Sequence, residues 1–232
     1  MGTLVNQDTM SAGTKTIGII GGTPIDTRMG QDFVEKQGHK SIGRAAADNL
    51  EDQARMQVLE KEKLYGITLE KIRELSKEGA EGVIIYCNSL SSSLDLEKLR
   101  QEALLPLVTP LDVYKNLAPK YKLIMLLSAA NTSNMSIEHI MREQNQDLTV
   151  IGVSVLPVVS AIENNEDPSK IFTGLGLKKF SEAALELEAE AIFLACTHFP
   201  YFEAEINAFL KGKKVEVINP AVEMVDLLCE KI

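Results

Sequence analysis

Short apolar runs alternate along this chain with longer amphipathic stretches, and this alternation restricts the fold more than any other feature. Runs of four to six mostly apolar residues have the length of buried strands, and the stretches between them carry helical periodicity. Strands separated by helices favour a parallel sheet with helices on both faces. Ligands then bind beyond the carboxyl ends of the strands. The predicted strands are 16–20, 82–86, 123–127, 150–155, 191–195 and 215–218.

Helical patterns fill the gaps between these strands. A Gly21-Gly22 turn follows the first strand, and Thr23 is placed to cap a helix with Pro24 at its first position. A second helical stretch covers 48–78, with a break expected near Gly66. The remaining helices are expected at 112–118, 132–145, 158–165, 168–188, 200–210 and 220–231.

Two segments of the chain share one plan. Residues 81–89 read Glu-Gly-Val-Ile-Ile-Tyr-Cys-Asn-Ser, and residues 190–198 read Glu-Ala-Ile-Phe-Leu-Ala-Cys-Thr-His. Two lobes of the same topology, each delivering one cysteine at a strand end, explain this recurrence. We therefore predict an α/β fold of two similar lobes, each a mostly parallel sheet flanked by helices, with the active site in the cleft between them. The first lobe is 14–110 plus 214–232, the second is 111–213, and 1–13 form a flexible N-terminus.

The two strand-end cysteines, Cys87 and Cys196, carry the predicted chemistry. A thiol between a strand and a helix lies near unpaired helix N–H groups, which lower its pKa and can also hold a carboxylate. Two thiols on opposite faces of one carbon can invert it, because one removes a proton while the other donates one. His198 is placed to assist Cys196. Donors suited to a carboxylate or an α-amino group follow both cysteines: Asn88, Ser89, Ser91 to Ser93 and Thr197.

At these residues the chain resembles the aspartate/glutamate racemase family. The resemblance is carried by Gly18-Ile-Ile-Gly-Gly22, Cys87-Asn-Ser89 and Cys196-Thr-His-Phe-Pro200, and it covers nearly the whole chain after residue 14. It implies an isomerase that racemises or epimerises an amino acid without a cofactor, and it implies frequent homodimers. Cys87 and Cys196 resemble the acid and base thiols, and His198 the partner of the second thiol. Glu163 resembles a second-lobe glutamate of glutamate racemases, although a solvated glutamate at a helix end is an equal alternative.

The loop after the first strand departs from glutamate racemases, which carry Asp-Ser-Gly there. This chain has Gly21-Gly22-Thr23, as in aspartate-type members, and Asp26 either replaces the missing aspartate or supports the helix start. Gly22 and Thr23 join the expected substrate-binding residues. Arg28, the arginine nearest these loops, is the predicted clamp for a second substrate carboxylate. The expected substrate is therefore an acidic or related amino acid.

Charge and cysteine content exclude several classes of partner. The formal net charge of −9 disfavours nucleic acid and anionic membranes. Apolar stretches fall short of the roughly 20 residues that a spanning helix needs. The three cysteines lack metal-site spacing and indicate reduced thiols, and Cys229 is expected to be a small buried hydrophobic residue. We expect a cytoplasmic protein with no metal, no cofactor, and a small amino acid as its ligand.

Alternative functions remain open at this level. A cysteine-dependent isomerase of a dicarboxylate belongs to the same superfamily, whereas a related decarboxylase typically lacks one of the two cysteines. A non-catalytic amino-acid-binding module needs the donors but not both thiols. The pair Cys196 and His198 suits a thiol hydrolase poorly, because no triad spacing accompanies it. Residues 18–23 lack the glycine spacing of a dinucleotide-binding loop.

Overall fold

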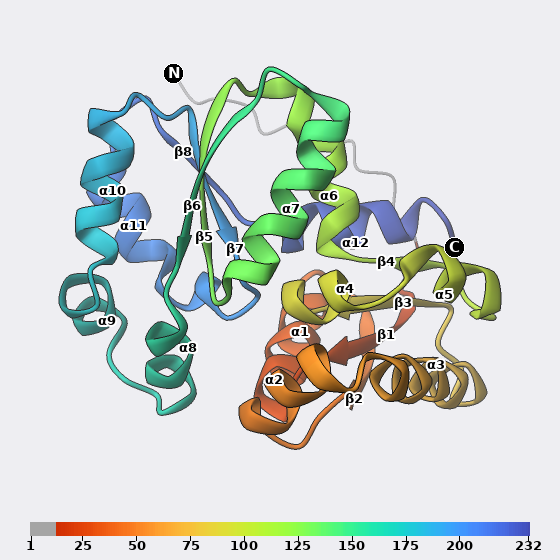
Figure 1. Ribbon diagram of the computed structural model, residues 1–232. Coiled ribbons are helices and arrows are strands. Elements are labelled where there is room, and N and C mark those ends of the chain that lie inside the picture. Colours follow the sequence, from red (N-terminus) through yellow and green to blue (C-terminus); the bar gives the residue numbers. More distant parts are fainter. Residues whose placement is uncertain (1–12) are drawn as a thin grey trace, which may run out of the picture.

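The protein, described by a computed structural model over residues 13–232, consists of two α/β lobes, each built on a four-stranded parallel sheet (Figure 1). The strand orders β2-β1-β3-β4 and β6-β5-β7-β8 are the same pattern repeated. This confirms the predicted fold class. The prediction of a flexible N-terminus at 1–13 lies outside the described residues except for Gly13.

The first lobe begins with a strand, a helix capped by Thr23, and a second strand that pairs in parallel with the first. Its predicted helix 48–78 is divided at Glu60 instead of Gly66. The elements are β1 (Thr16–Gly21), α1 (Pro24–Lys36), β2 (Lys40–Ala45), α2 (Leu50–Leu59), α3 (Lys61–Lys77), β3 (Gly82–Tyr86), α4 (Asn88–Ser93), α5 (Leu96–Glu102) and β4 (Leu107–Val108).

The second lobe repeats this order of strands around its own parallel sheet. The predicted helix 168–188 is two helices separated near Gly176, which has a positive φ of 83°. The elements are α6 (Pro110–Leu117), the 3-10 turn η1 (Ala118–Lys120), β5 (Leu123–Ser128), α7 (Asn131–Gln144), β6 (Thr149–Ser154), α8 (Leu156–Glu163), α9 (Pro168–Gly174), α10 (Leu177–Glu186), β7 (Ala191–Ala195), the 3-10 turn η2 (Phe199–Phe202), α11 (Glu203–Leu210), β8 (Glu216–Ile218) and α12 (Ala221–Cys229).

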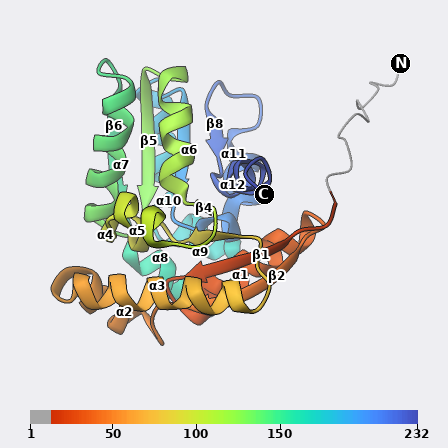
Figure 2. The ribbon, with the colours of Figure 1, turned by 90° about the vertical axis from the view of Figure 1, so that its right-hand side faces the viewer.

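The chain segment 214–232 is divided between the lobes. Strand β8 pairs with β7 in the second sheet, so the predicted placement of this strand in the first lobe is wrong. Helix α12 contacts β3 and β4 of the first lobe and also α6. It lies where the two lobes meet in both views (Figures 1 and 2).

Central strands are apolar along their whole length because helices cover both faces of each sheet. All five residues of β3 and all five of β7 are buried. One core cluster also crosses between the lobes and includes Ile84 of β3 and Phe193 of β7. The shared core fixes the two sheets relative to each other, so the carboxyl ends of β3 and β7 face a common space.

Within residues 13–232, no helix combines the length and the apolar composition that crossing a membrane requires. The same residues contain no cluster of three or more His, Cys, Asp or Glu side chains arranged to hold a metal ion.

Candidate active site

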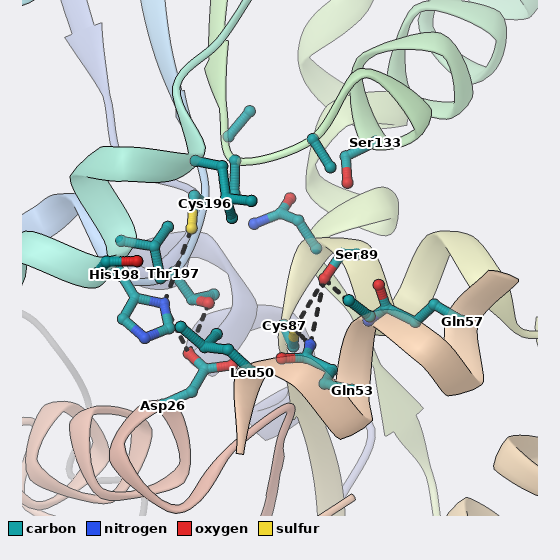
Figure 3. Close-up of a pocket in the computed structure, with 18 of the residues that line it drawn as sticks. Asp26, Leu50, Gln53, Gln57, Cys87, Ser89, Ser133, Cys196, Thr197 and His198 are labelled. Atoms are coloured by element: carbon teal, nitrogen blue, oxygen red, sulfur yellow. Dashed lines mark hydrogen bonds and ion pairs between the residues drawn. The ribbon is translucent and has the colours of Figure 1, made fainter. Parts of the chain in front are cut away.

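The two strand-end cysteines line one cavity between the lobes. Cys87 follows β3 and Cys196 follows β7, and their exposed fractions are 5% and 7%. Both border a cavity of about 300 Å³, and Figure 3 shows the two side chains on opposite sides of it. Helices α2 and α8 and the loop after β5 complete the wall.

The thiol of Cys196 lies beside a histidine held by two carboxylates. His198 Nδ1 is 3.8 Å from Cys196 Sγ and 3.7 Å from Asp26 Oδ1, and Nε2 is 3.1 Å from Glu163 Oε1. Asp26 is 1% exposed and accepts hydrogen bonds from Thr197 Oγ1 at 2.7 Å and from a backbone N–H in its own loop. Residues from both lobes therefore fix the ring of His198.

These neighbours determine the charge of His198. Burial lowers the pKa of His198, but the Asp26 charge, the hydrogen bonds to Cys196 and Glu163 and the Cys196 charge together raise it to about 11. An imidazolium therefore faces Cys196 at neutral pH.

The groups that contact the thiol of Cys87 are neutral instead. Gln53 Nε2 donates to Cys87 Sγ at 3.3 Å, and Ser89 Oγ lies 3.5 Å from the same sulfur. Gln57 Nε2 donates to Ser89 Oγ at 3.0 Å and completes this group of amides and a hydroxyl.

Burial, followed by the charge of Asp26, raises the pKa of Cys87 well above its ordinary value, and the hydrogen bonds from Ser89 and the Leu90 N–H only partly oppose this. The sequence prediction that a helix start lowers this pKa is wrong for Cys87. The N–H groups of α4 are present, but desolvation of the buried sulfur outweighs them.

A glycine makes the contact between Gln53 and Cys87 possible. A Cβ on Gly22 would lie 2.1 Å from Gln53 Nε2, which is far closer than atoms can approach. Gly22 itself donates its backbone N–H to Asp26 Oδ2 at 3.0 Å. The Gly21-Gly22 turn thus gives room to the Cys87 side of the site and holds a carboxylate on the Cys196 side.

Six of the sequence-predicted site residues line the cavity: Cys87, Cys196, His198, Asn88, Ser89 and Thr197. Among them, Asn88 is 3% exposed, and its Oδ1 accepts a hydrogen bond of 2.7 Å from Tyr114 Oη. Its Nδ2 is buried without a partner in the described residues. An unpaired buried donor in a cavity wall is suited to a substrate oxygen.

The other predicted site residues lie behind the wall or away from it. Thr23 Oγ1 donates to Glu163 Oε1 at 3.1 Å, so this pair supports His198 from behind. Ser91 is fully buried and donates to Cys87 O at 2.7 Å, which stabilises the start of α4 and leaves no contact for a substrate. Arg28 pairs with Asp32 at 2.7 Å, and 65% of its side chain is exposed. Neither Ser91 nor Arg28 therefore lines the cavity, so its wall does not support their predicted substrate roles.

The terminal cysteine differs from its expected character. Cys229 is only partly buried, and its Sγ lies 3.6 Å from His39 Nε2. Cys229 does not line the cavity.

Sequence reasoning missed the contribution of α2. Leu50, Gln53, Ala54 and Gln57 all line the cavity. Their spacing of three and four residues places them on one helix face, which is the available signal. An amphipathic helix with this spacing is common, however, and nothing in it marks a catalytic face.

The fold and cavity define a class of two-lobed α/β proteins with a thiol at the end of a central strand in each lobe. The chain belongs to the Asp/Glu/hydantoin racemase family, whose sequence model matches residues 43–228. This confirms the predicted family and makes the chain an isomerase of the racemase type.

Individual relatives agree with this assignment. A glutamate racemase of Limosilactobacillus reuteri is 28% identical over 201 residues, covering 83% of this chain and 67% of the relative. The crystal structure of glutamate racemase from Francisella tularensis in complex with D-glutamate superposes with a TM-score of 0.70 at 14% identity, covering 94% of this chain and 81% of the other. An aspartate racemase of Picrophilus torridus superposes with a TM-score of 0.67 at 17% identity, covering 94% of each chain. At these identities the solved structures establish the fold.

Proposed function

We propose that this protein racemises an amino acid without a cofactor, by proton transfer between two thiols and one α-carbon. The observation that carries the proposal is the shared cavity, because the buried side chains of Cys87 and Cys196 both border it. Removal of a proton on one face and delivery on the other gives inversion.

The two halves of the site suggest which thiol holds the proton before the substrate binds. The imidazolium of His198 faces Cys196 Sγ from Nδ1 and Glu163 Oε1 from Nε2, so we assign the role of base to Cys196. Burial keeps Cys87 a neutral thiol, which acts as the acid. For the opposite enantiomer the two roles exchange.

General acid–base catalysis supplies only about 10²–10⁴-fold, which is too little for an α-hydrogen of an amino acid. Positioning contributes up to about 7–11 kcal/mol. Donors aimed at the substrate carboxylate stabilise the negative charge that develops there. The unpaired Nδ2 of Asn88 is such a donor.

We also propose an oligomeric state, a cellular location and lobe boundaries. Resemblance to the family supports a homodimer and a cytoplasmic location. The packing of α12 on β3 and the pairing of β8 with β7 support a first lobe of 14–110 plus α12 and a second lobe of 111–218.

The proposal is tested by chiral chromatography of L- and D-amino acids after incubation with the enzyme and with three variants. Cys87→Ser and Cys196→Ser each remove one proton carrier, so we expect the loss of nearly all racemisation. Cys229→Ser is the matched control, since Cys229 does not line the cavity, and it retains activity. A Cys87→Ser or Cys196→Ser variant with wild-type turnover would contradict the proposal and favour a binding module.

A further inference from the structure

The cavity that holds the two thiols contains no arginine or lysine. The chain has six arginines, and within residues 13–232 none of them lines this wall. Arg28 pairs with Asp32, and Arg44 and Arg55 form ion pairs with glutamates outside the cavity. The imidazolium of His198 is already held between Cys196, Asp26 and Glu163.

The wall instead carries negative charge. Asp26 uses its oxygens for Thr197 and the N–H of Gly22. Glu51, an exposed residue in the first turn of α2, adds a second carboxylate to the lining. A second carboxylate on the substrate would lose its hydration here, meet a like charge, and find no cationic partner.

The rest of the wall comes from both lobes, and apolar side chains alternate in it with neutral hydroxyl and amide groups such as Ser133 and Ser160. Leu156 is 56% exposed although it is large and apolar, and part of its surface borders the cavity. An apolar substrate side chain would cover this surface. The apolar lining residues are Leu50 and Ala54 of α2, Leu156 and Val159 of α8, Ala129 and Ala130 after β5, and Ala195 of β7.

We infer that the substrate is an amino acid whose side chain is uncharged and mainly apolar, an inference that rests on the proposed racemase function. The reaction itself requires only the α-hydrogen and the α-carboxylate, for which Asn88 Nδ2 is available. The side chain lies against the wall formed by α2 and α8. A cavity of about 300 Å³ accepts one amino acid.

The test compares substrates of matched size in deuterated water, with α-hydrogen exchange followed by NMR. L-leucine, L-methionine and L-glutamine are compared with L-glutamate, L-aspartate and L-lysine. We expect kcat/KM for L-leucine or L-methionine to exceed that for L-glutamate by at least about tenfold. A highest value for glutamate, aspartate or lysine would overturn the inference and leave the two-thiol reaction intact.

A binding measurement separates this inference from the proposed function. The Cys87→Ser/Cys196→Ser double variant cannot turn over, and calorimetry reports its affinity for L-leucine and L-glutamate. Tighter binding of leucine without exchange by the wild-type enzyme would support the inference and contradict the racemase proposal. Tighter binding of glutamate would overturn the inference.

A charge introduced on the wall provides a second test. Ala54 is exposed on the cavity face of α2, so Ala54→Arg places a cation there without filling the core. We expect the ratio of kcat/KM for glutamate to that for leucine to rise by about tenfold, as one charge-assisted hydrogen bond gives. Ala54→Met adds comparable bulk without charge and leaves glutamate disfavoured. An unchanged ratio in Ala54→Arg would argue against charge as the basis of selection.

Discussion

Replacement of Asp26 by asparagine tests the electrostatic design of the Cys196 half of the site. The carboxylate lies 3.7 Å from His198 Nδ1, and both residues are buried. An asparagine keeps the size and an acceptor oxygen for one of its partners, Gly22 N–H or Thr197 Oγ1, but removes the charge. We therefore expect a large change in the pKa of His198 and only a small change in structure.

The magnitude follows from the distance. At 3.7 Å and an effective dielectric constant of about 20, one pair of unit charges is worth about 4 kcal/mol. That energy corresponds to a change of about 3 in pKa, so Asp26→Asn lowers the pKa of His198 from about 11 to about 8. Glu163 Oε1 lies 3.1 Å from Nε2 and keeps the pKa of His198 in this variant above that of an ordinary histidine.

The assay is an NMR titration of the histidine rings. The chain has three histidines, and a His198→Gln variant assigns the signal of His198. In the wild type, His198 stays protonated through pH 9, whereas in Asp26→Asn it titrates near pH 8. A wild-type His198 that titrates near pH 6.5, or one that Asp26→Asn leaves unchanged, would refute this reasoning.

The same pKa has a consequence for stability. Because folding raises the pKa of His198 from near 6.5, its stabilisation is complete below about pH 6.5 and is lost as the pH rises toward 11. The raised pKa of Cys87 acts in the same direction above about pH 8.5. Urea unfolding between pH 7 and 10 should show falling stability, by at most about 1.4 kcal/mol per pH unit from His198. In Asp26→Asn, the loss of stability above pH 8 should be smaller than in the wild type.

Two further substitutions test the Cys87 half of the site, and a third tests the surface residue Arg28. Gln53→Met removes the donor at 3.3 Å from Cys87 Sγ, and steady-state assays should show kcat/KM reduced by about 10-fold, equally for both enantiomers because their equilibrium constant is one. Gly22→Ala displaces the Gln53 amide, so it should cause a similar loss of kcat/KM. The double variant should lose little more than either single variant, whereas fully additive losses would show that the two residues act independently. Arg28→Ala should leave kcat and KM unchanged, since Arg28 pairs with Asp32 at the surface, and a raised KM would restore its predicted role as a clamp.

The central strands were predictable from the sequence because parallel strands covered on both faces must be apolar throughout. The edge strand β2 (Lys40–Ala45) carries lysine, serine and arginine and is only partly buried, so it gave no such signal. Helix α2 likewise ends at Leu59 with no glycine or proline at the break, so the sequence carries no signal for it.

The two thiols were predictable because each directly follows a buried central strand, and ligands bind beyond the carboxyl ends of parallel strands. The helix-borne residues were not, because their positions depend on how a helix is rotated. Asp26 and Arg28 are two residues apart on α1, which separates their directions by about 200°. Asp26 consequently faces the cavity, whereas Arg28 faces solvent. Gln53 belongs to a helix distant in sequence from Cys87, and only the folded chain brings the two together.

The most direct test of the two-thiol reaction is the isotope content of each enantiomer early in a reaction run in deuterated water. If Cys87 and Cys196 act on opposite faces, the newly formed enantiomer carries solvent deuterium at the α-carbon while the remaining starting enantiomer keeps its hydrogen. Equal deuterium in both enantiomers after a few per cent conversion would mean that one group serves both faces, which contradicts the account.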